Sequence, residues 1–169
     1  MTLTAEHETA VTEMHNEYQN YFSKWLYILN EGFSILLYGL GSKRNLLQTF
    51  HSTCLCNQTV LVVNGFFPSL TIKDVLDSIT NDILSMSVSS RNYHEIVDII
   101  EEKLSSNTEI NIFLLVHNID GVMLRNHKAQ YILSRLAKIE QIHLIASIDH
   151  INTPLCKYIV ENFRLHVII

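Results

Sequence analysis

Apolar side chains recur every three or four residues along the first thirty positions of the chain, which is the spacing of one face of an α-helix. The positions on this face are Val11, Met14, Tyr18, Tyr21, Phe22, Trp25 and Leu29. We therefore predict one amphipathic helix over residues 4–30, and we expect Glu31 and Gly32 to end it, because glycine readily takes the backbone conformation of a helix C-terminus. The pattern indicates an N-terminal helix within residues 1–31 that packs on a domain over residues 32–169.

Beyond residue 32 the pattern changes to short runs that are apolar throughout. Five such runs occur: residues 35–38 (ILLY), 60–63 (VLVV), 112–116 (IFLLV), 142–146 (IHLIA) and 166–169 (HVII). A strand that is buried on both faces loses the alternation of apolar and polar residues, and this is typical of parallel sheets covered by helices. The runs therefore predict the strands of a parallel sheet.

Helical patterns fill the segments between these runs. They predict helices over residues 43–51, 71–87, 93–104 and 127–139. Thr71 and Asp74 have the spacing of a capping box at the start of the second of these helices. Because strands and helices alternate, the predicted fold class is α/β, a three-layer sandwich with a five-stranded parallel sheet and right-handed crossovers.

Composition and charge narrow the classes of function. The 169 residues, 47% apolar and 17% charged, suit one folded domain with a sizeable core. A net charge of −5 argues against a general affinity for nucleic acid, which Lys and Arg dominate. No apolar run reaches the ~18 residues of a membrane span, and three cysteines do not make a disulfide framework. We expect a soluble, intracellular protein with no membrane partner.

The first apolar run leads into YGLGSKR, which has the layout of a phosphate-binding loop at the carboxyl end of a strand. A working loop has the spacing G-x-x-x-x-G-K-[ST]. Here Gly39 and Gly41 stand too close to Lys43, Ser42 replaces the last glycine, and Arg44 replaces the hydroxyl that holds magnesium. We interpret the segment as a vestigial phosphate loop whose glycines serve the turn, with weak anion binding at the helix N-terminus left open.

The third apolar run ends where an ATPase of this type carries its acidic residues. Such enzymes use an aspartate there to support magnesium, often with a glutamate that activates water. This chain has His117 and Asn118 at these positions, and neither supplies the anionic oxygen that magnesium prefers. Asp120, two residues later, is expected to cap the turn before the next helix. The two losses together predict a degenerate metal and hydrolysis site, with no catalytic residue and no bound metal.

An alternative interpretation is an atypical P-loop ATPase that binds nucleotide through Lys43 and takes its magnesium ligand from Asp120 or Asp149. Ser147, Asp149 and His150 follow the fourth apolar run, where such enzymes sense the terminal phosphate, but we favour an ordinary polar loop there.

Two smaller motifs carry weaker chemistry. His51, Cys54 and Cys56 suggest a metal site, but a tetrahedral zinc site needs a fourth ligand and the chain offers no second paired motif. Phe66 and Phe67 follow the second apolar run, and we expect one of them to pack inward and the other to be partly exposed at a partner surface.

Four segments together resemble one family. GFSILLYGLGSKRNLLQTF, VNGFFPSLTIKDVLDSI, FLLVHNIDGVMLR and IHLIASIDHINTPL are similar, in this order from about Gly32 to Leu155, to the ATPase-like domain of origin recognition complex subunit 2. The combination of YGLGSKR, NGFFP and ASIDH carries the resemblance.

The resemblance implies a fold of the AAA+ type and a role as a non-hydrolysing scaffold in the complex that binds replication origins in the nucleus. It implies contact with the other subunits, subunit 3 above all, and with origin DNA within the complex rather than by this chain alone. It implies no cofactor, and it assigns no catalytic residue, because the matching positions Arg44, His117 and Asn118 lack that chemistry.

The chain departs from the family after Pro154 and Leu155, where CKYIVENFRLHVII replaces a segment of the Met-Trp-Asp type. The family also carries a C-terminal winged-helix domain. We therefore expect a short or divergent form without the lid and winged-helix domains.

Overall fold

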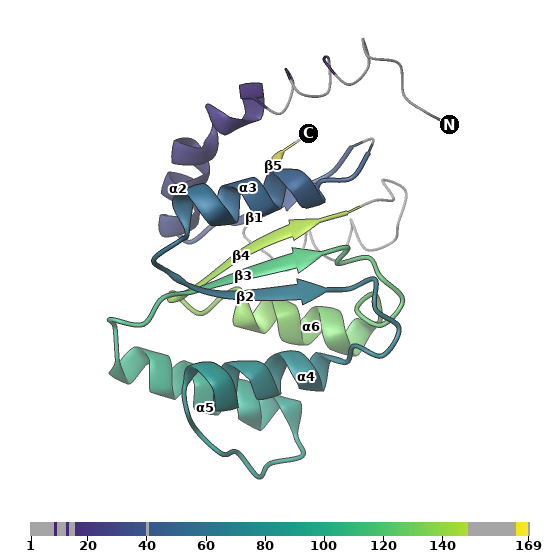
Figure 1. The fold of residues 1–169 in the computed structure, drawn as a ribbon. Coiled ribbons are helices and arrows are strands. Elements are labelled where there is room, and N and C mark those ends of the chain that lie inside the picture. Colours follow the sequence, from purple (N-terminus) through teal and green to yellow (C-terminus); the bar gives the residue numbers. More distant parts are fainter. Residues whose placement is uncertain (1–8, 10–12, 14–15, 40, 149–164, 169) are drawn as a thin grey trace.

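The computed structural model describes Thr9, Glu13 and residues 16–39, 41–148 and 165–168. Its helices and strands alternate along the chain, as the sequence predicts (Figure 1). In chain order they are α2 (Phe22–Asn30), β1 (Ser34–Leu37), α3 (Arg44–Cys54), β2 (Thr59–Asn64), α4 (Ile72–Asp77), the π-helix η1 (Ser78–Ile83), α5 (Tyr93–Ser106), β3 (Ile112–His117), α6 (His127–Leu136), β4 (Ile142–Ser147) and β5 (Leu165–Ile168).

The strands form one sheet in the order β2-β3-β4-β1-β5. Every neighbouring pair is parallel, with Leu36 opposite Ala146 and Val63 opposite Val116. This confirms the predicted α/β class with a parallel sheet. Because all strands run the same way, their carboxyl ends lie at the same end of the sheet, and the loops that follow them lie close together.

Helices cover both faces of the sheet, with α2 and α3 on one side and α4, α5 and α6 on the other (Figure 1). Successive residues of a strand therefore enter different cores. In β3, Phe113 and Leu115 pack in the cluster under α2 and α3, whereas Leu114 and Val116 pack in the cluster under the other helices. This double burial explains why the central strands read as uninterrupted apolar runs.

Helix α2 packs through an aromatic cluster. The ring of Trp25 lies 5.3 Å from that of Phe22 and 5.4 Å from that of Phe50 on α3, measured between centroids. Trp25 is only 1% exposed. These contacts join the N-terminal segment to the first crossover helix.

The prediction of one continuous helix over residues 4–30 is wrong in the part that the structure describes. Residues 16–19 are helical, but a turn at Asn20 and Tyr21 separates them from α2. The backbone N–H of each turn residue donates to the carbonyl three positions earlier, which breaks the phase of the helix. Tyr21 is consequently 52% exposed and not on the buried face. Val11 and Met14 lie outside the described residues.

The predicted helix over residues 71–87 is shorter than expected and changes type. The capping box is confirmed, because the Thr71 side chain accepts from the Asp74 N–H and the Asp74 carboxylate accepts from the Thr71 N–H at 2.7 Å. After Asp77 the chain widens into η1, which ends at Ile83. Ser85 then takes a left-handed conformation, with φ 51°, which a helix cannot continue.

Candidate functional site

The glycine loop after β1 and the carboxyl ends of β2, β3 and β4 enclose a small cavity of about 150 Å³. Its lining comprises Ser42, Lys43, Arg44, Asn64, Phe66, His117, Asn118 and Ser147. The structure thus brings the predicted vestigial loop together with the predicted degenerate metal positions. The volume is below the ~300 Å³ at which small-molecule and cofactor pockets begin.

Gly39 and Gly41 shape the loop through their backbone conformation. Their φ angles are +130° and +88°, in the region that residues with a side chain rarely adopt. A Cβ atom at either position would meet no atom within 4 Å. The turn therefore requires these glycines for their backbone conformation and not for close contact with neighbouring atoms.

Lys43 does not extend freely from the loop. Its Nζ donates to the carbonyl oxygen of Gly39 and, at 3.0 Å, to that of Ile148 just after β4. The side chain is half-buried and links the loop to a strand end more than a hundred residues away in sequence. An ammonium that holds two protein carbonyls has to break these bonds before it can contact a phosphate.

Arg44 begins α3 and is exposed. Burial and, secondarily, the positive charge of Arg44 lower the pKa of His117 below its usual value. Because the unperturbed value is about 6.5, His117 is neutral at neutral pH. A neutral imidazole therefore stands where a magnesium site needs anionic oxygen, and Arg44 stands where it needs a hydroxyl.

Asn118 takes part in the strand-end structure through its backbone. It has a left-handed φ of 52°, which asparagine tolerates better than most residues. Its N–H donates to the Ser147 hydroxyl at 3.1 Å, and the Ile119 N–H donates to the Ser147 carbonyl at 3.0 Å. Ser147 thus ties the ends of β3 and β4 together.

Asp120 lies in the turn after β3, where its capping of the turn stays a prediction, and it does not cap the following helix. The N-cap of α6 is Asn126, whose side chain accepts from the Ala129 N–H at 2.8 Å. Asp120 is 9% exposed and is not among the residues that line the cavity. Asp149 and His150 lie outside the described residues.

The expectation that either Phe66 or Phe67 packs inward is wrong. Phe66 is 78% exposed and Phe67 is 59% exposed. The cause lies in Gly65, whose N–H donates to the His117 carbonyl at 2.8 Å and which packs against the turn after β3 so closely that the chain leaves the sheet there. A glycine directly after a strand was the sequence signal for this close approach.

Within the described ranges, no group of three or more His, Cys, Asp or Glu side chains is placed to hold a metal ion. Cys54 is half-buried and Cys56 is exposed, both as free thiols. In the same part of the chain, no helix combines the length and the apolar character needed to cross a membrane.

Replacing Lys43 by methionine is expected to lower the free energy of unfolding by about 2 kcal/mol, because two hydrogen bonds from a charged donor are lost. The measurement is urea denaturation without nucleotide, followed by circular dichroism. Lys138→Met is the control at an exposed lysine, with an expected change within about 0.5 kcal/mol. Equal stabilities for the two variants would contradict the structural role of Lys43.

Acidification is expected to destabilise the fold through His117 and His143. Burial lowers the pKa of both, and for His143 the hydrogen bond to the Leu29 carbonyl opposes this only in part. Below about pH 6.5 the unfolded state binds protons that the folded state does not, so stability falls as the pH drops from there through the lowered folded-state pKa values. Urea midpoints between about pH 7.5 and pH 5 test this. Arg44→Gln should reduce the loss of stability on acidification. Urea midpoints that do not change with pH would contradict the role of the two histidines.

A parallel sheet with helices on both faces and a glycine loop after its first strand is the arrangement of nucleotide-binding α/β folds, a class that includes the RecA-like, P-loop-type ATPase folds. A chain of the solved structure of Aeropyrum pernix ORC1 in complex with DNA has this fold, with a TM-score of 0.60 over 88% of the present chain and 44% of that chain. At 15% sequence identity this likeness concerns the fold alone.

The model of the family described as "Origin recognition complex subunit 2 RecA-like domain" matches residues 10–163, and the chain belongs to this family. It is 66% identical over 152 residues to origin recognition complex subunit 2 of Drosophila melanogaster and 43% identical over 143 residues to that of Homo sapiens. These matches cover 90% and 85% of the chain but only 25% of each relative. The chain therefore spans about a quarter of these relatives' length.

A solved structure of Drosophila ORC bound to AT-rich DNA and Cdc6 contains a similar chain. It has a TM-score of 0.92 at 60% identity and covers 98% of this chain and 58% of that one.

Proposed function

We propose that the chain is the ATPase-like domain of an origin recognition complex subunit 2 and that it acts as a non-hydrolysing scaffold in the initiation of DNA replication. Residues 32–169 form this domain in the proposal, and the N-terminal segment within residues 1–31 packs on it. The burial of α2 against α3 supports this packing. No catalytic residue, metal or cofactor is assigned.

The observation that carries the scaffold role is the state of Lys43. Its ammonium serves two backbone carbonyls, and the strand end opposite carries neutral His117 and Asn118. Hydrolysis of ATP requires magnesium with anionic oxygen ligands and a group that orients water. Among the described residues, those that line the cavity include no carboxylate.

The other subunits of the complex, with subunit 3 foremost, are the proposed partners, and the nucleus is the proposed location. Contact with origin DNA takes place within the complex in this proposal. Two findings support it: the net charge of −5, and the 60% identity to a chain in a solved structure of ORC bound to DNA and Cdc6.

The experiment is co-expression of the chain with subunit 3, followed by affinity purification and size-exclusion chromatography, with ATP present or absent. We expect a complex of equal yield under both conditions. No complex under either condition would contradict the scaffold role.

The alternative function is an atypical ATPase that binds nucleotide through Lys43. Under that alternative, Lys43→Ala abolishes nucleotide binding and leaves assembly unchanged, whereas the scaffold proposal expects no nucleotide binding to lose.

A further inference from the structure

Strand β2 forms one edge of the sheet and is not protected as edge strands usually are. It pairs with β3 on one side, and no second strand neighbours it among the described residues. Natural proteins shield such edges with charged residues, proline or bulges, because the free N–H and C=O groups recruit other strands. The sequence of β2, TVLVVN, contains no charge and no proline. An edge strand of this kind is suited to pair with a strand from another chain.

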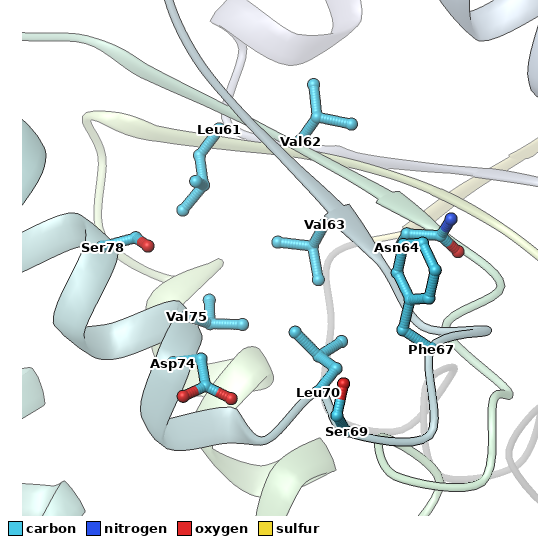
Figure 2. A pocket seen from close by; sticks show the side chains of 10 residues that line it. All are labelled: Leu61, Val62, Val63, Asn64, Phe67, Ser69, Leu70, Asp74, Val75 and Ser78. Carbon is cyan, nitrogen blue, oxygen red and sulfur yellow. The ribbon is translucent and has the colours of Figure 1, made fainter.

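A groove of about 380 Å³ runs beside this edge, between β2, the loop that follows it and α4. Figure 2 shows Leu61 and Val63 pointing from β2 toward Val75 on α4, with Leu70 from the connecting loop beside them. Val62 points to the other side of the strand and is 49% exposed. The edge therefore presents apolar side chains on both of its faces.

Exposed apolar residues continue past the end of β2. Phe66 and Phe67 follow it directly, and Val122, 67% exposed, lies in the turn whose Gly121 contacts Gly65. With Val62, these account for four of the eight large hydrophobic residues exposed in the described part of the chain. Such clustering marks an interaction surface, whereas scattered apolar residues do not.

The charge at the groove decides the kind of occupant. Asp74 is the charged residue among those that line it, and no described lysine or arginine forms an ion pair with it. A basic residue in the occupant complements this negative charge, whereas an acidic residue there would be repelled.

We propose that β2 is a docking edge for an extended segment of a partner protein, which adds a strand to the sheet. The segment carries apolar side chains at alternate positions, directed into the groove, and a lysine or arginine that contacts Asp74. Backbone hydrogen bonds to the edge supply affinity, and the side chains in the groove supply specificity.

A random octapeptide library displayed on phage and selected against the purified 169-residue chain tests this without any other subunit. We expect enrichment of sequences with alternating apolar residues and a lysine or arginine. Synthetic peptides from the selection should slow hydrogen exchange of the β2 amides. No enrichment, enrichment of acidic sequences, or protection confined to other elements would overturn the proposal.

Two variants and a matched control locate the site. Val62→Lys places a charge on the edge and should weaken binding of the selected peptide at least tenfold. Tyr27→Lys, at an exposed residue of α2 that belongs neither to the groove nor to the exposed apolar cluster, should change binding less than twofold. Equal losses would place the peptide elsewhere and overturn the proposal. Asp74→Asn retains a capping side chain and should reduce the preference for a basic residue by roughly two- to fivefold, the range of one exposed ion pair. An unchanged preference would also count against it.

Discussion

Replacing Trp25 by alanine is expected to lower the free energy of unfolding by about 3–5 kcal/mol, the range for removing a large aromatic side chain from a core. Trp25 is 1% exposed and packs between Phe22 and Phe50, so its loss leaves a cavity between α2 and α3. Because a domain is stable by only about 5–15 kcal/mol, a large share of the total would be lost. The measurement is urea denaturation followed by circular dichroism. Tryptophan fluorescence does not serve here, because the variant lacks the chain's one tryptophan.

Tyr27→Ala is the matched control on the same helix, where the tyrosine is 65% exposed. We expect this substitution to change stability by no more than about 0.5 kcal/mol. A Trp25→Ala loss under about 1 kcal/mol would mean that α2 is not part of the domain's core.

Replacing Gly121 by alanine is expected to destabilise the fold by about 3 kcal/mol, at the upper end of the usual range for overpacking. An added Cβ would stand 2.0 Å from the Gly65 carbonyl oxygen and 3.0 Å from that of Asn118. Both neighbours are backbone atoms, so the two turns after β2 and β3 would have to separate. The same change at Gly65 would bring a Cβ to 2.2 Å from the Asn118 carbonyl oxygen.

Val122→Ala is the control for this position, because the neighbouring valine is exposed and its truncation should fall within about 0.5 kcal/mol. Thermal unfolding of both variants, compared with the unsubstituted chain, gives the answer. Matching unfolding temperatures for Gly121→Ala and Val122→Ala would show that the two turns do not interlock.

The sheet was predictable because its central strands are buried on both faces and therefore carry continuous apolar runs. Each predicted strand lies within one residue of the observed one at both ends. The capping box at Thr71 was equally predictable, because two residues three positions apart, Thr71 and Asp74, determine it. The break in the N-terminal helix at Asn20 could not be predicted, because the helical spacing of apolar residues continues through it. The break arises from backbone hydrogen bonds, which the side-chain pattern does not reveal.

The sequence predicted which residues meet at the site, but it did not predict the hydrogen bonds between them. Strand topology alone places these residues at the carboxyl end of the sheet: Lys43, Arg44, His117 and Asn118. The bond from Lys43 to the Ile148 carbonyl joins residues 105 positions apart, and no local pattern encodes it. The contact of Gly65 with Gly121 is long-range in the same way, and it is what leaves both phenylalanines exposed.

Calorimetric titration of the purified chain with ATP and magnesium at neutral pH tests most directly whether the phosphate loop is vestigial. We predict no binding heat up to millimolar ATP, because Lys43 is engaged with backbone carbonyls and the described residues of the cavity lining offer no carboxylate for magnesium. Saturable, magnesium-dependent binding in the micromolar range that Lys43→Met abolishes would contradict the scaffold role and favour the atypical ATPase.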